Sequence, residues 1–266
     1  MRIATVTVMR GEVGQLRRLL ASLEWADERH VVETGPEVEA TVDAAGDAVV
    51  HHAPRPLGTG FDDARAVALT AVEAQWVLVV DTDEEIPEPL VDRLRTEAES
   101  WHREGVAGVW LPRLNHVLGT PLLHSSTWPD YQMRFLRPEA AVFSPVLHEP
   151  LGVGGPARWL PADPRCAIQH HNFRSTTQFV EKLNLYSTIE AGQGGRGGRP
   201  TVRAAVRAGV REFLARYVKM RGFRDGPEGL HYCILHGMYR YLIGSKLWEQ
   251  RGRGGGGSSR GHPRRR

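Results

Sequence analysis

The sequence predicts an α/β fold in which a mainly parallel sheet is covered by helices on both faces. Strand-like and helix-like segments alternate over the first 85 residues, and residues 76–80 form an uninterrupted apolar run, as expected for a strand buried on both faces. From residue 106 onward, strand-like segments between Pro- and Gly-rich loops indicate a mixed half of the same sheet. With 266 residues, 41% of them hydrophobic, the chain can bury a substantial core.

The individual elements follow from the spacing of their apolar residues. Strands, recognised by alternation or by short apolar runs, are expected over 3–8, 29–33, 48–52, 76–80, 106–111, 131–136 and 167–171. Helices, recognised by apolar residues three or four positions apart, are expected over 12–23, 61–74, 202–221 and 230–249.

The chain divides into an acidic body and a basic end. Residues 1–190 carry 17 Lys and Arg against 27 Asp and Glu, whereas the remainder carries 17 against 4. We expect an α/β domain over 1–190, a helical region over 200–250 and a disordered Gly- and Arg-rich tail over 251–266. A basic end of this kind suits an anionic partner, either a membrane surface or nucleic acid.

Several classes of protein are disfavoured. No run of about 18 apolar residues is present, so we expect no membrane-spanning helix, and residues 1–8 lack the apolar stretch of a secretion signal. Cys166 and Cys233 are too few for a disulfide scaffold, and they fit a reducing, cytoplasmic setting. No nucleic-acid-binding motif accompanies the Arg-rich tail, so no specific nucleic-acid partner is expected.

The sharpest local signal is the pair of carboxylates that follows the apolar run 76–80. Asp81 and Asp83 are spaced i, i+2, which on an extended backbone puts both on one face. They would lie beyond the carboxyl end of a strand, where open α/β sheets bind ligands. Two carboxylates there could hold Mg²⁺ or Mn²⁺ against a pyrophosphate, and the cation would offset charge on the departing diphosphate. The alternative is a solvated acidic loop before a helix, whose first turn favours carboxylates.

Two later segments carry further candidates. Asp130 and Glu149 are possible general bases for an acceptor hydroxyl, with His148 a weaker one; the alternative is that Glu149 pairs structurally with a nearby arginine. His170 and His171 point to opposite sides if they lie on a strand, so at most one of them faces the site. That histidine could be a further metal ligand, or it could be purely structural.

Six segments, in this order, resemble family 2 glycosyltransferases of the GT-A fold, and most closely the bacterial branch that includes lipopolysaccharide-core glucosyltransferases. They are SLEWADE at 22–28, Trp76 to Pro87, Trp128 to Arg137, His148-Glu149, His170 to Ser187, and GFRDGPEGL at 222–230. The resemblance implies a Rossmann-like mixed sheet flanked by helices, with amphipathic helices at the C-terminal end. It also implies a nucleotide-sugar donor, a divalent cation (Mn²⁺ or Mg²⁺) and an inverting displacement, so that an α-linked donor would give a β-glycoside.

The resemblance also implies roles for particular residues. Asp83 matches the main metal carboxylate and His170 the late histidine, whereas Asp81 would lie beside the ribose and pyrophosphate. Glu149 falls where many relatives place an acidic residue next to the acceptor and is taken as the base, with Asp130 as the other possibility.

The departures from the family pattern lie in the donor half. Gly11 stands where relatives have Asn, and Glu33 stands where they have an Asp that touches the nucleotide. Arg65 keeps the first residue of an Arg-Asn pair whose second is here Ala66. Glu33 keeps the charge and can still accept a hydrogen bond from a shifted position. Two other functions therefore stay open: a nucleotidyltransferase of similar topology, and a non-catalytic binding module with an altered donor half.

The predicted helix 202–221 has an apolar stripe, and its basic residues fall away from that stripe. This pattern is typical of a helix in a membrane interface, with arginines toward lipid phosphates. Residues 202–248 could thus meet an anionic membrane surface, placing the chain in the cytoplasm or peripherally on the inner membrane face with a glycan or lipid-linked acceptor. The alternative is that the stripe packs on the protein's own core.

Overall fold

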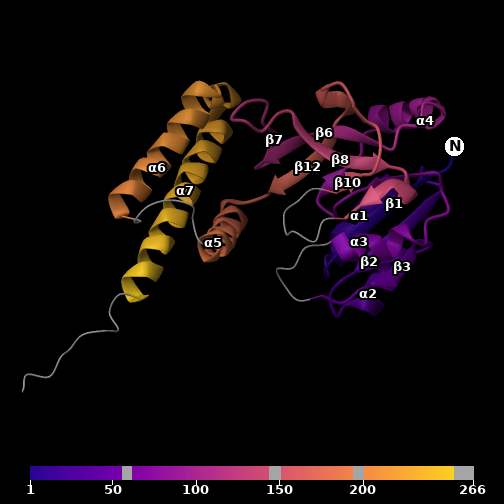
Figure 1. Ribbon diagram of the computed structural model, residues 1–266, viewed down its shortest axis with the longest axis horizontal. Coiled ribbons are helices and arrows are strands. Elements are labelled where there is room, and N and C mark those ends of the chain that lie inside the picture. Colours follow the sequence, from indigo (N-terminus) through magenta and orange to yellow (C-terminus); the bar gives the residue numbers. More distant parts are fainter. Residues whose placement is uncertain (56–61, 144–150, 194–200, 255–266) are drawn as a thin grey trace, which may run out of the picture. The chain divides into compact units, whose positions relative to one another are not determined.

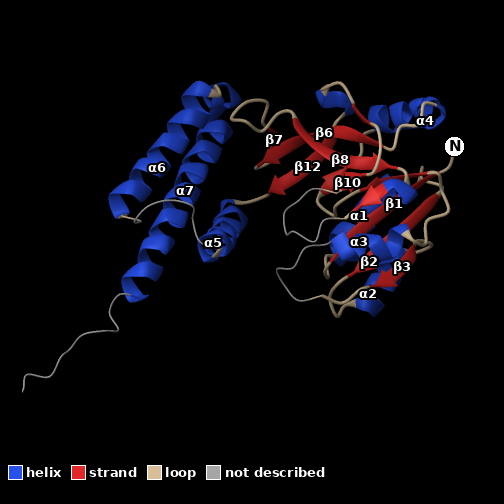
Figure 2. Cartoon of the chain, in the orientation of Figure 1, coloured by secondary structure: helices blue, strands red, loops and turns tan. Residues whose placement is uncertain are grey.

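The structure is a computed structural model that describes residues 1–55, 62–143, 151–193 and 201–254. The chain forms two compact units. The first, which we call the sheet unit, comprises Met1–His116 and Trp128–Asn172. The second, the helical unit, comprises Val117–Thr127 and Phe173–Arg266. Most strands lie in the first unit, together with helices, whereas the second unit is mainly helical (Figure 2).

The sheet unit is built on one mixed sheet with the strand order β3-β2-β1-β4-β8-β6-β12-β5 (Figure 1). These strands are β1 Ile3–Met9, β2 Glu28–Glu33, β3 Val49–His52, β4 Trp76–Val79, β5 Glu84–Glu85, β6 Gly108–Val117, β8 Asp130–Leu136 and β12 Ile168–Phe173. Strands β1 to β4 pair in parallel, whereas β8 runs antiparallel to both β4 and β6. The predicted parallel half and mixed half are both confirmed.

Helices and short strands complete the unit. The helices are α1 Val13–Ser22, α2 Val38–Ala45, α3 Asp62–Leu69 and α4 Glu88–Arg103, and the short elements are η1 Pro138–Ala140, β9 Ala141–Val142, β10 Gly152–Val153, β11 Ala157–Trp159 and η2 Pro164–Cys166. The α/β Rossmann-like fold expected from the sequence is therefore present. Helix α4 was expected only in the alternative interpretation, which placed a helix after the acidic segment; Pro87 precedes its first turn and one side of it is buried.

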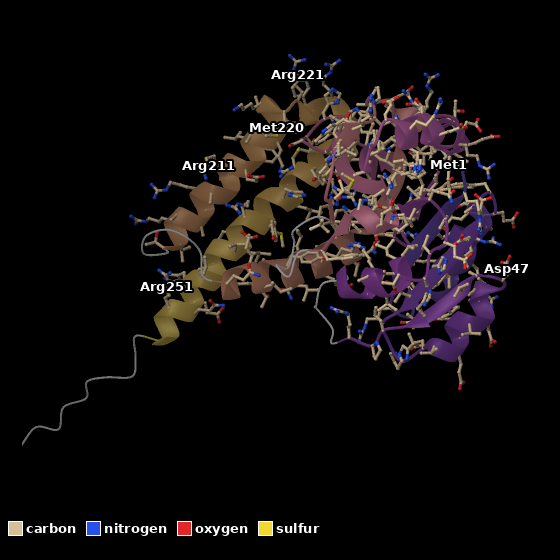
Figure 3. All side chains as sticks on the ribbon, turned by 45° about the vertical axis from the view of Figure 1, so that its right-hand side comes forward. Met1, Asp47, Arg211, Met220, Arg221 and Arg251 are labelled. Carbon is tan, nitrogen blue, oxygen red and sulfur yellow. The ribbon has the colours of Figure 1, made fainter. Side chains whose placement is uncertain are left out.

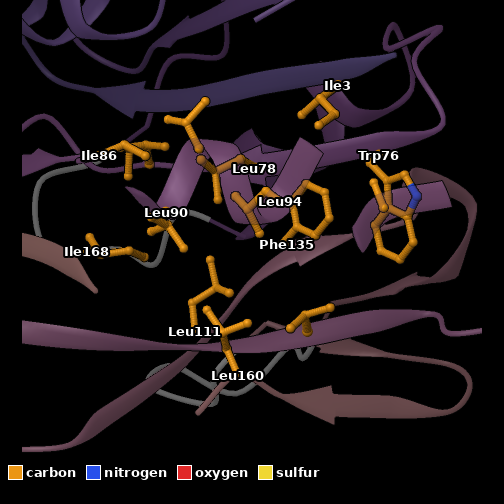
Figure 4. Packing of buried hydrophobic residues seen from close by; sticks show 14 of the residues in the cluster. Ile3, Trp76, Leu78, Ile86, Leu90, Leu94, Leu111, Phe135, Leu160 and Ile168 are labelled. Carbon is orange, nitrogen blue, oxygen red and sulfur yellow. The ribbon is translucent and has the colours of Figure 1, made fainter. Parts of the chain in front are cut away.

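The core explains why strand β4 is apolar at every position. Trp76 and Leu78 pack in a cluster with α4 on one face of the sheet (Figure 4), whereas Val77 and Val79 pack in a cluster with α3 on the other. The Trp76 ring stacks on Phe135 of β8 with 4.7 Å between ring centroids. A strand buried on both faces cannot alternate with polar residues, so β4 is apolar up to its carboxyl end.

The helical unit contains three long helices and several short elements: α5 Thr176–Gly192, α6 Val202–Leu214, α7 Gly226–Gly254, strand β7 Thr120–Pro121, the π-turn η3 Ala215–Lys219 and the 3₁₀ turn η4 Gly222–Asp225. Ser175 and Thr201 cap α5 and α6 by accepting hydrogen bonds from backbone N–H groups of the first turn. Phe179 and Tyr232 pack in the core between α5 and α7. Over the described residues, no helix is long and apolar enough to cross a membrane.

Candidate functional site

The acidic segment after β4 forms a tight turn, not a continuation of the strand. The backbone N–H of Glu84 donates to the carbonyl of Asp81 at 3.0 Å, and the N–H of Asp81 donates to the Glu84 carboxylate at 2.9 Å. The expectation that Asp81 and Asp83 share one face of an extended backbone is therefore wrong in its geometry. The turn sends the two carboxylates to different partners.

Asp81 is engaged by two arginines. Its carboxylate pairs with Arg134 of β8, and Arg65 of α3 approaches it at 3.4 Å. Burial raises the pKa of the Asp81 carboxyl, but the charges of Arg134 and Arg65 outweigh it and hold that pKa well below its usual range. Asp81 is thus ionised at neutral pH, and its charge is already balanced by the protein.

Glu84 lies at the centre of a buried charge network that the sequence reasoning did not find. Its side chain is fully buried and accepts hydrogen bonds from Arg134 at 3.1 Å and Arg113 at 3.3 Å. Burial lowers the pKa of Arg134, but the neighbouring carboxylates Asp81 and Glu84 more than reverse this and raise it. The only signal in the sequence was that Arg134 is a charged residue within the predicted strand 131–136, whereas Arg113 lies beyond the predicted end of the strand 106–111.

Asp130, a candidate base, belongs to the same network. Its carboxylate accepts hydrogen bonds from Arg113 at 2.7 and 2.9 Å, from Asn115 at 3.1 Å and from Gln132 at 2.8 Å. Burial raises the pKa of Asp130, but Arg113 and these hydrogen bonds outweigh it and lower the pKa overall. The carboxylate is consequently held in a fixed orientation and is a weak proton acceptor.

Asp83 and His170 face one another. Strand β12 pairs with β5 so that His170 lies opposite Glu84, which brings the His170 Nε2 atom to 3.5 Å from the Asp83 Oδ2 atom. The other ring nitrogen, Nδ1, is 2.7 Å from the Oδ1 atom of Asn115. Since that amide oxygen can only accept, Nδ1 is the donor in this contact, which leaves Nε2 as the ring nitrogen that faces Asp83.

His171 points elsewhere, as the strand alternation predicted. Its Nε2 atom lies 3.4 Å from Glu85, and both side chains are exposed. Only His170 therefore joins the candidate site, whereas Glu85 of β5 and His171 of β12 form a separate pair that solvent reaches.

Glu33 has both carboxylate oxygens occupied by its own chain. They accept hydrogen bonds from the N–H groups of Gly11 at 3.1 Å and Gly35 at 2.6 Å, and from the hydroxyl of Thr41 at 2.7 Å, and the residue is fully buried. This geometry supports a loop-shaping role more than the expected contact with a nucleotide hydroxyl. Gly11 has a φ of 75°, a region that Gly adopts more readily than other residues, so Gly suits the backbone conformation at this position.

Glu12 adds negative charge on the side of Asp83. The pKa of Glu12 is raised, above all by burial, and the carboxylates of Asp83 and Glu33 raise it further. The backbone N–H of Arg10, which donates to the Glu12 carboxylate at 2.9 Å, acts in the opposite direction and lowers the pKa. Glu149, proposed as the base, and His148 lie outside the described residues.

The candidate residues that the structure describes thus share one polar network, apart from Glu33 and His171. From Arg65 the contacts run through Asp81, Arg134, Glu84, Arg113, Asp130, Asn115 and His170 to Asp83. Among the described residues, no cluster of three or more His, Cys, Asp or Glu side chains is arranged to hold a metal ion by itself. Any cation held by Asp83 and His170 would need further ligands from a substrate or water.

No family model matches the chain. Its similarity to solved structures is partial. The bifunctional IspDF from Campylobacter jejuni is 9% identical with a TM-score of 0.45, over 67% of this chain and 54% of that one, so the chain spans about half of its length. TarS 1–349 from S. aureus, solved with UDP, is 13% identical with a TM-score of 0.45, over 96% and 92% of the two chains. Glucosyl-3-phosphoglycerate synthase from Mycobacterium tuberculosis, solved with Mn²⁺, UDP and glucosyl-3-phosphoglycerate, is 23% identical with a TM-score of 0.34, over 43% and 44%.

Proposed function

We propose that this chain is a metal-dependent, inverting glycosyltransferase that moves a sugar from a nucleotide-sugar donor to an acceptor hydroxyl, as the resemblance to family 2 glycosyltransferases implies. The observation that carries the proposal is the 3.5 Å approach of Asp83 Oδ2 to His170 Nε2, with the other ring nitrogen tied to Asn115. Two acceptor atoms that face each other at this distance repel unless a proton or a cation lies between them.

The two atoms fit a divalent cation. Ligand atoms that share an ion about 2.1 Å away lie about 3 Å from each other, so the observed spacing needs only a small adjustment. Carboxylate and neutral imidazole are suitable ligands for Mn²⁺, and the hydrogen bond from His170 Nδ1 to Asn115 is the kind of outer contact that fixes a ligand's tautomer. When bound, the cation would offset negative charge on the departing diphosphate.

The arginine-bound carboxylate has a different role in this proposal. Asp81 holds the guanidinium groups of Arg134 and Arg65 in place, and these two cations keep a divalent ion away from Asp81 itself. Arg65, whose side chain is partly accessible, is proposed to approach the donor's phosphates. We therefore assign the cation to Asp83 and the ribose and pyrophosphate side of the donor to Asp81 and Arg65.

The transfer itself needs one proton acceptor. The acceptor hydroxyl oxygen forms a bond to the anomeric carbon, the bond from that carbon to the diphosphate oxygen breaks, and the hydroxyl proton passes to a carboxylate. Because its pKa is lowered, Asp130 is a weak acceptor of that proton. We propose Glu149 as the base and Asp130 as a residue that orients the acceptor. The acceptor class in this proposal is a glycan or a lipid-linked sugar.

The experiment is a titration of the full chain with Mn²⁺, followed by electron paramagnetic resonance, alone and with a panel of UDP-, GDP- and dTDP-sugars. We expect Asp83→Asn and His170→Gln to abolish tight Mn²⁺ binding. The matched variants Glu85→Gln and His171→Gln, which alter the exposed pair on the same strands, should leave it unchanged. Equal effects in both pairs, or no Mn²⁺ binding by the unmodified protein, would refute the metal assignment.

The products separate the other two functions when the panel is extended by nucleoside triphosphates with a sugar phosphate. Release of pyrophosphate from a nucleoside triphosphate would identify a nucleotidyltransferase. Release of nucleoside diphosphate from a nucleotide-sugar would identify a glycosyltransferase, and binding without turnover a non-catalytic module. A nucleotidyltransferase would want a cationic phosphate loop after β1. The Arg10 guanidinium instead donates to the backbone carbonyls of Thr34 at 3.2 Å and Arg55 at 2.7 Å, so its position favours the transferase.

A further inference from the structure

Helix α6 exposes two adjacent rows of side chains. The apolar row consists of Val202, Val206, Val210 and Leu214 and continues through Val218 in the π-turn, and all five are between 39% and 58% exposed. The basic row, displaced by one residue, consists of Arg203, Arg207 and Arg211 and continues through Lys219, and all four are exposed. Arg211 is labelled on α6 in Figure 3. Residues four apart follow one another along a helix, so the apolar row is a continuous stripe, and the basic row is continuous from Arg203 to Arg211, with Ala215 between Arg211 and Lys219.

A different side of α6 packs against α7. A Cβ atom built on Gly209 would lie 2.8 Å from the carbonyl oxygen of Gly237, and one built on Gly244 would lie 2.7 Å from the Cβ atom of Ala205. Small residues thus let the two helices approach closely, and the packing of α6 does not use its valines. Of the predicted apolar stripe, Phe213 and Tyr217 pack against the core of the unit. The expectation that the whole stripe might pack on the core is wrong for the valine row.

The basic row carries uncompensated charge. Within the described residues, none of its four side chains forms an ion pair with an acidic group. The single acid of α6, Glu212, hydrogen-bonds to Arg216 at 2.6 Å instead. The exposed face therefore combines a continuous apolar stripe with unneutralised positive charge.

We propose that this double row of α6 is a docking surface for an anionic lipid bilayer. The apolar row would enter the boundary between headgroups and acyl chains, and the basic row would face lipid phosphates. Two copies of the chain joined through the same face would bring two basic rows together, which like-charge repulsion disfavours. Trp248 of α7, 48% exposed, is a residue type that suits the headgroup region. Docking does not depend on the proposed transfer reaction, so the two proposals can fail separately.

The test is co-sedimentation of the full chain with vesicles of phosphatidylcholine alone or mixed with phosphatidylglycerol. We expect binding only to the anionic vesicles. Each basic residue near such a surface contributes roughly a fivefold change in binding, so Arg203→Gln/Arg207→Gln/Arg211→Gln should weaken it roughly 100-fold. The triple change Val206→Ser/Val210→Ser/Leu214→Ser should weaken binding by at least about tenfold, because it removes most of the apolar row.

Matched controls change the same chemistry on other surfaces. The charge control is Arg17→Gln/Arg18→Gln/Arg103→Gln, three exposed arginines of the sheet unit. The apolar control is Val42→Ser/Val67→Ser/Leu185→Ser, whose side chains are 42% to 55% exposed. Neither should lower vesicle binding by more than about twofold.

Three outcomes would overturn the proposal. One is vesicle binding that is unchanged in both α6 variants but lost when residues 255–266 are removed. Another is equal binding to neutral and anionic vesicles. The third is that the unmodified chain self-associates in analytical ultracentrifugation and that the serine triple variant loses this self-association but keeps vesicle binding. The apolar row would then bind a second copy of the chain. Circular dichroism spectra that match the unmodified protein establish that each variant is folded.

Discussion

Removal of the Asn115 amide tests whether Asp83 and His170 are arranged as metal ligands, because it alters neither of these two side chains. Asn115 is almost fully buried, and its side chain accepts from His170 Nδ1 at 2.7 Å and donates to Asp130 at 3.1 Å. In Asn115→Ala, Asp130 keeps its contacts to Arg113 and Gln132, so the network should survive. His170 loses the acceptor that fixes its tautomer and ring orientation.

The expected loss of Mn²⁺ affinity is about 10- to 100-fold, which is typical for the removal of an outer partner of a metal-binding histidine. This corresponds to about 1.4 to 2.7 kcal/mol of binding free energy. The assay is a Mn²⁺ titration followed by electron paramagnetic resonance, with the midpoint of thermal unfolding measured on the same sample. The loss of Mn²⁺ affinity should exceed what a lower midpoint of thermal unfolding would explain. A saturating Mn²⁺ concentration should restore part of the electron paramagnetic resonance signal of bound Mn²⁺.

The control lies one residue further along β6. His116 bonds to Gln169 at 2.9 Å and takes no part in the network, so His116→Ala removes a comparable contact between the same two strands. Mn²⁺ affinity that is unchanged in Asn115→Ala would refute the reasoning, because His170 would not then depend on its amide partner. An equal loss in His116→Ala would trace the effect to strand pairing.

Three further predictions concern stability, measured by urea unfolding. Arg134→Met leaves the buried Glu84 carboxylate without its closest cation and should lower the free energy of unfolding by about 3 to 5 kcal/mol. Burial above all lowers the pKa of His236 to about 3; the folded state therefore keeps it neutral, while the unfolded state takes up a proton below about pH 6.5. The stability that this group confers is fully present above pH 6.5 and is lost as the pH falls toward 3. Between pH 6.5 and 5, the free energy of unfolding should therefore fall by about 2 kcal/mol less in His236→Phe than in the unmodified protein. An identical pH profile of the two proteins would contradict this. Gly209→Ala should destabilise the helical unit by about 1 to 3 kcal/mol through its contact with α7, whereas Gly14→Ala, with nothing within 4 Å, should be neutral or stabilising.

The parts of the fold that the sequence predicted correctly are those that local periodicity determines. Strand β4 is apolar at every position because both of its faces are covered, and the acidic turn follows at its end. Helix α5, by contrast, was missed. Its apolar residues are spread around the helix, and only some, such as Phe179 and Leu183, are buried, so its one-sided signal is weak.

The buried charge network could not be predicted because its contacts are tertiary. Arg134 and Asp81 are 53 positions apart, and His170 and Asn115 are 55 apart. A single sequence shows that these residues are polar, but it does not show which ones meet. The pairing of β12 with β5 decides this, and strand β5 is only two residues long, which is too short for a periodic pattern.

The structure therefore adds to the acidic motif a distinction that its sequence alone cannot make. Two carboxylates spaced i, i+2 appear equivalent in the sequence, yet the turn between them gives Asp81 to two arginines and turns Asp83 toward His170. A divalent cation beside Asp81 would be repelled by guanidinium groups within a few ångströms, and weak dielectric screening strengthens that repulsion. The same cation beside Asp83 would meet a second ligand and the nearby negative charge of Glu12. In our proposal the two acids of the motif therefore have different roles, Asp83 toward the cation and Asp81 toward the arginines that would approach the donor's phosphates.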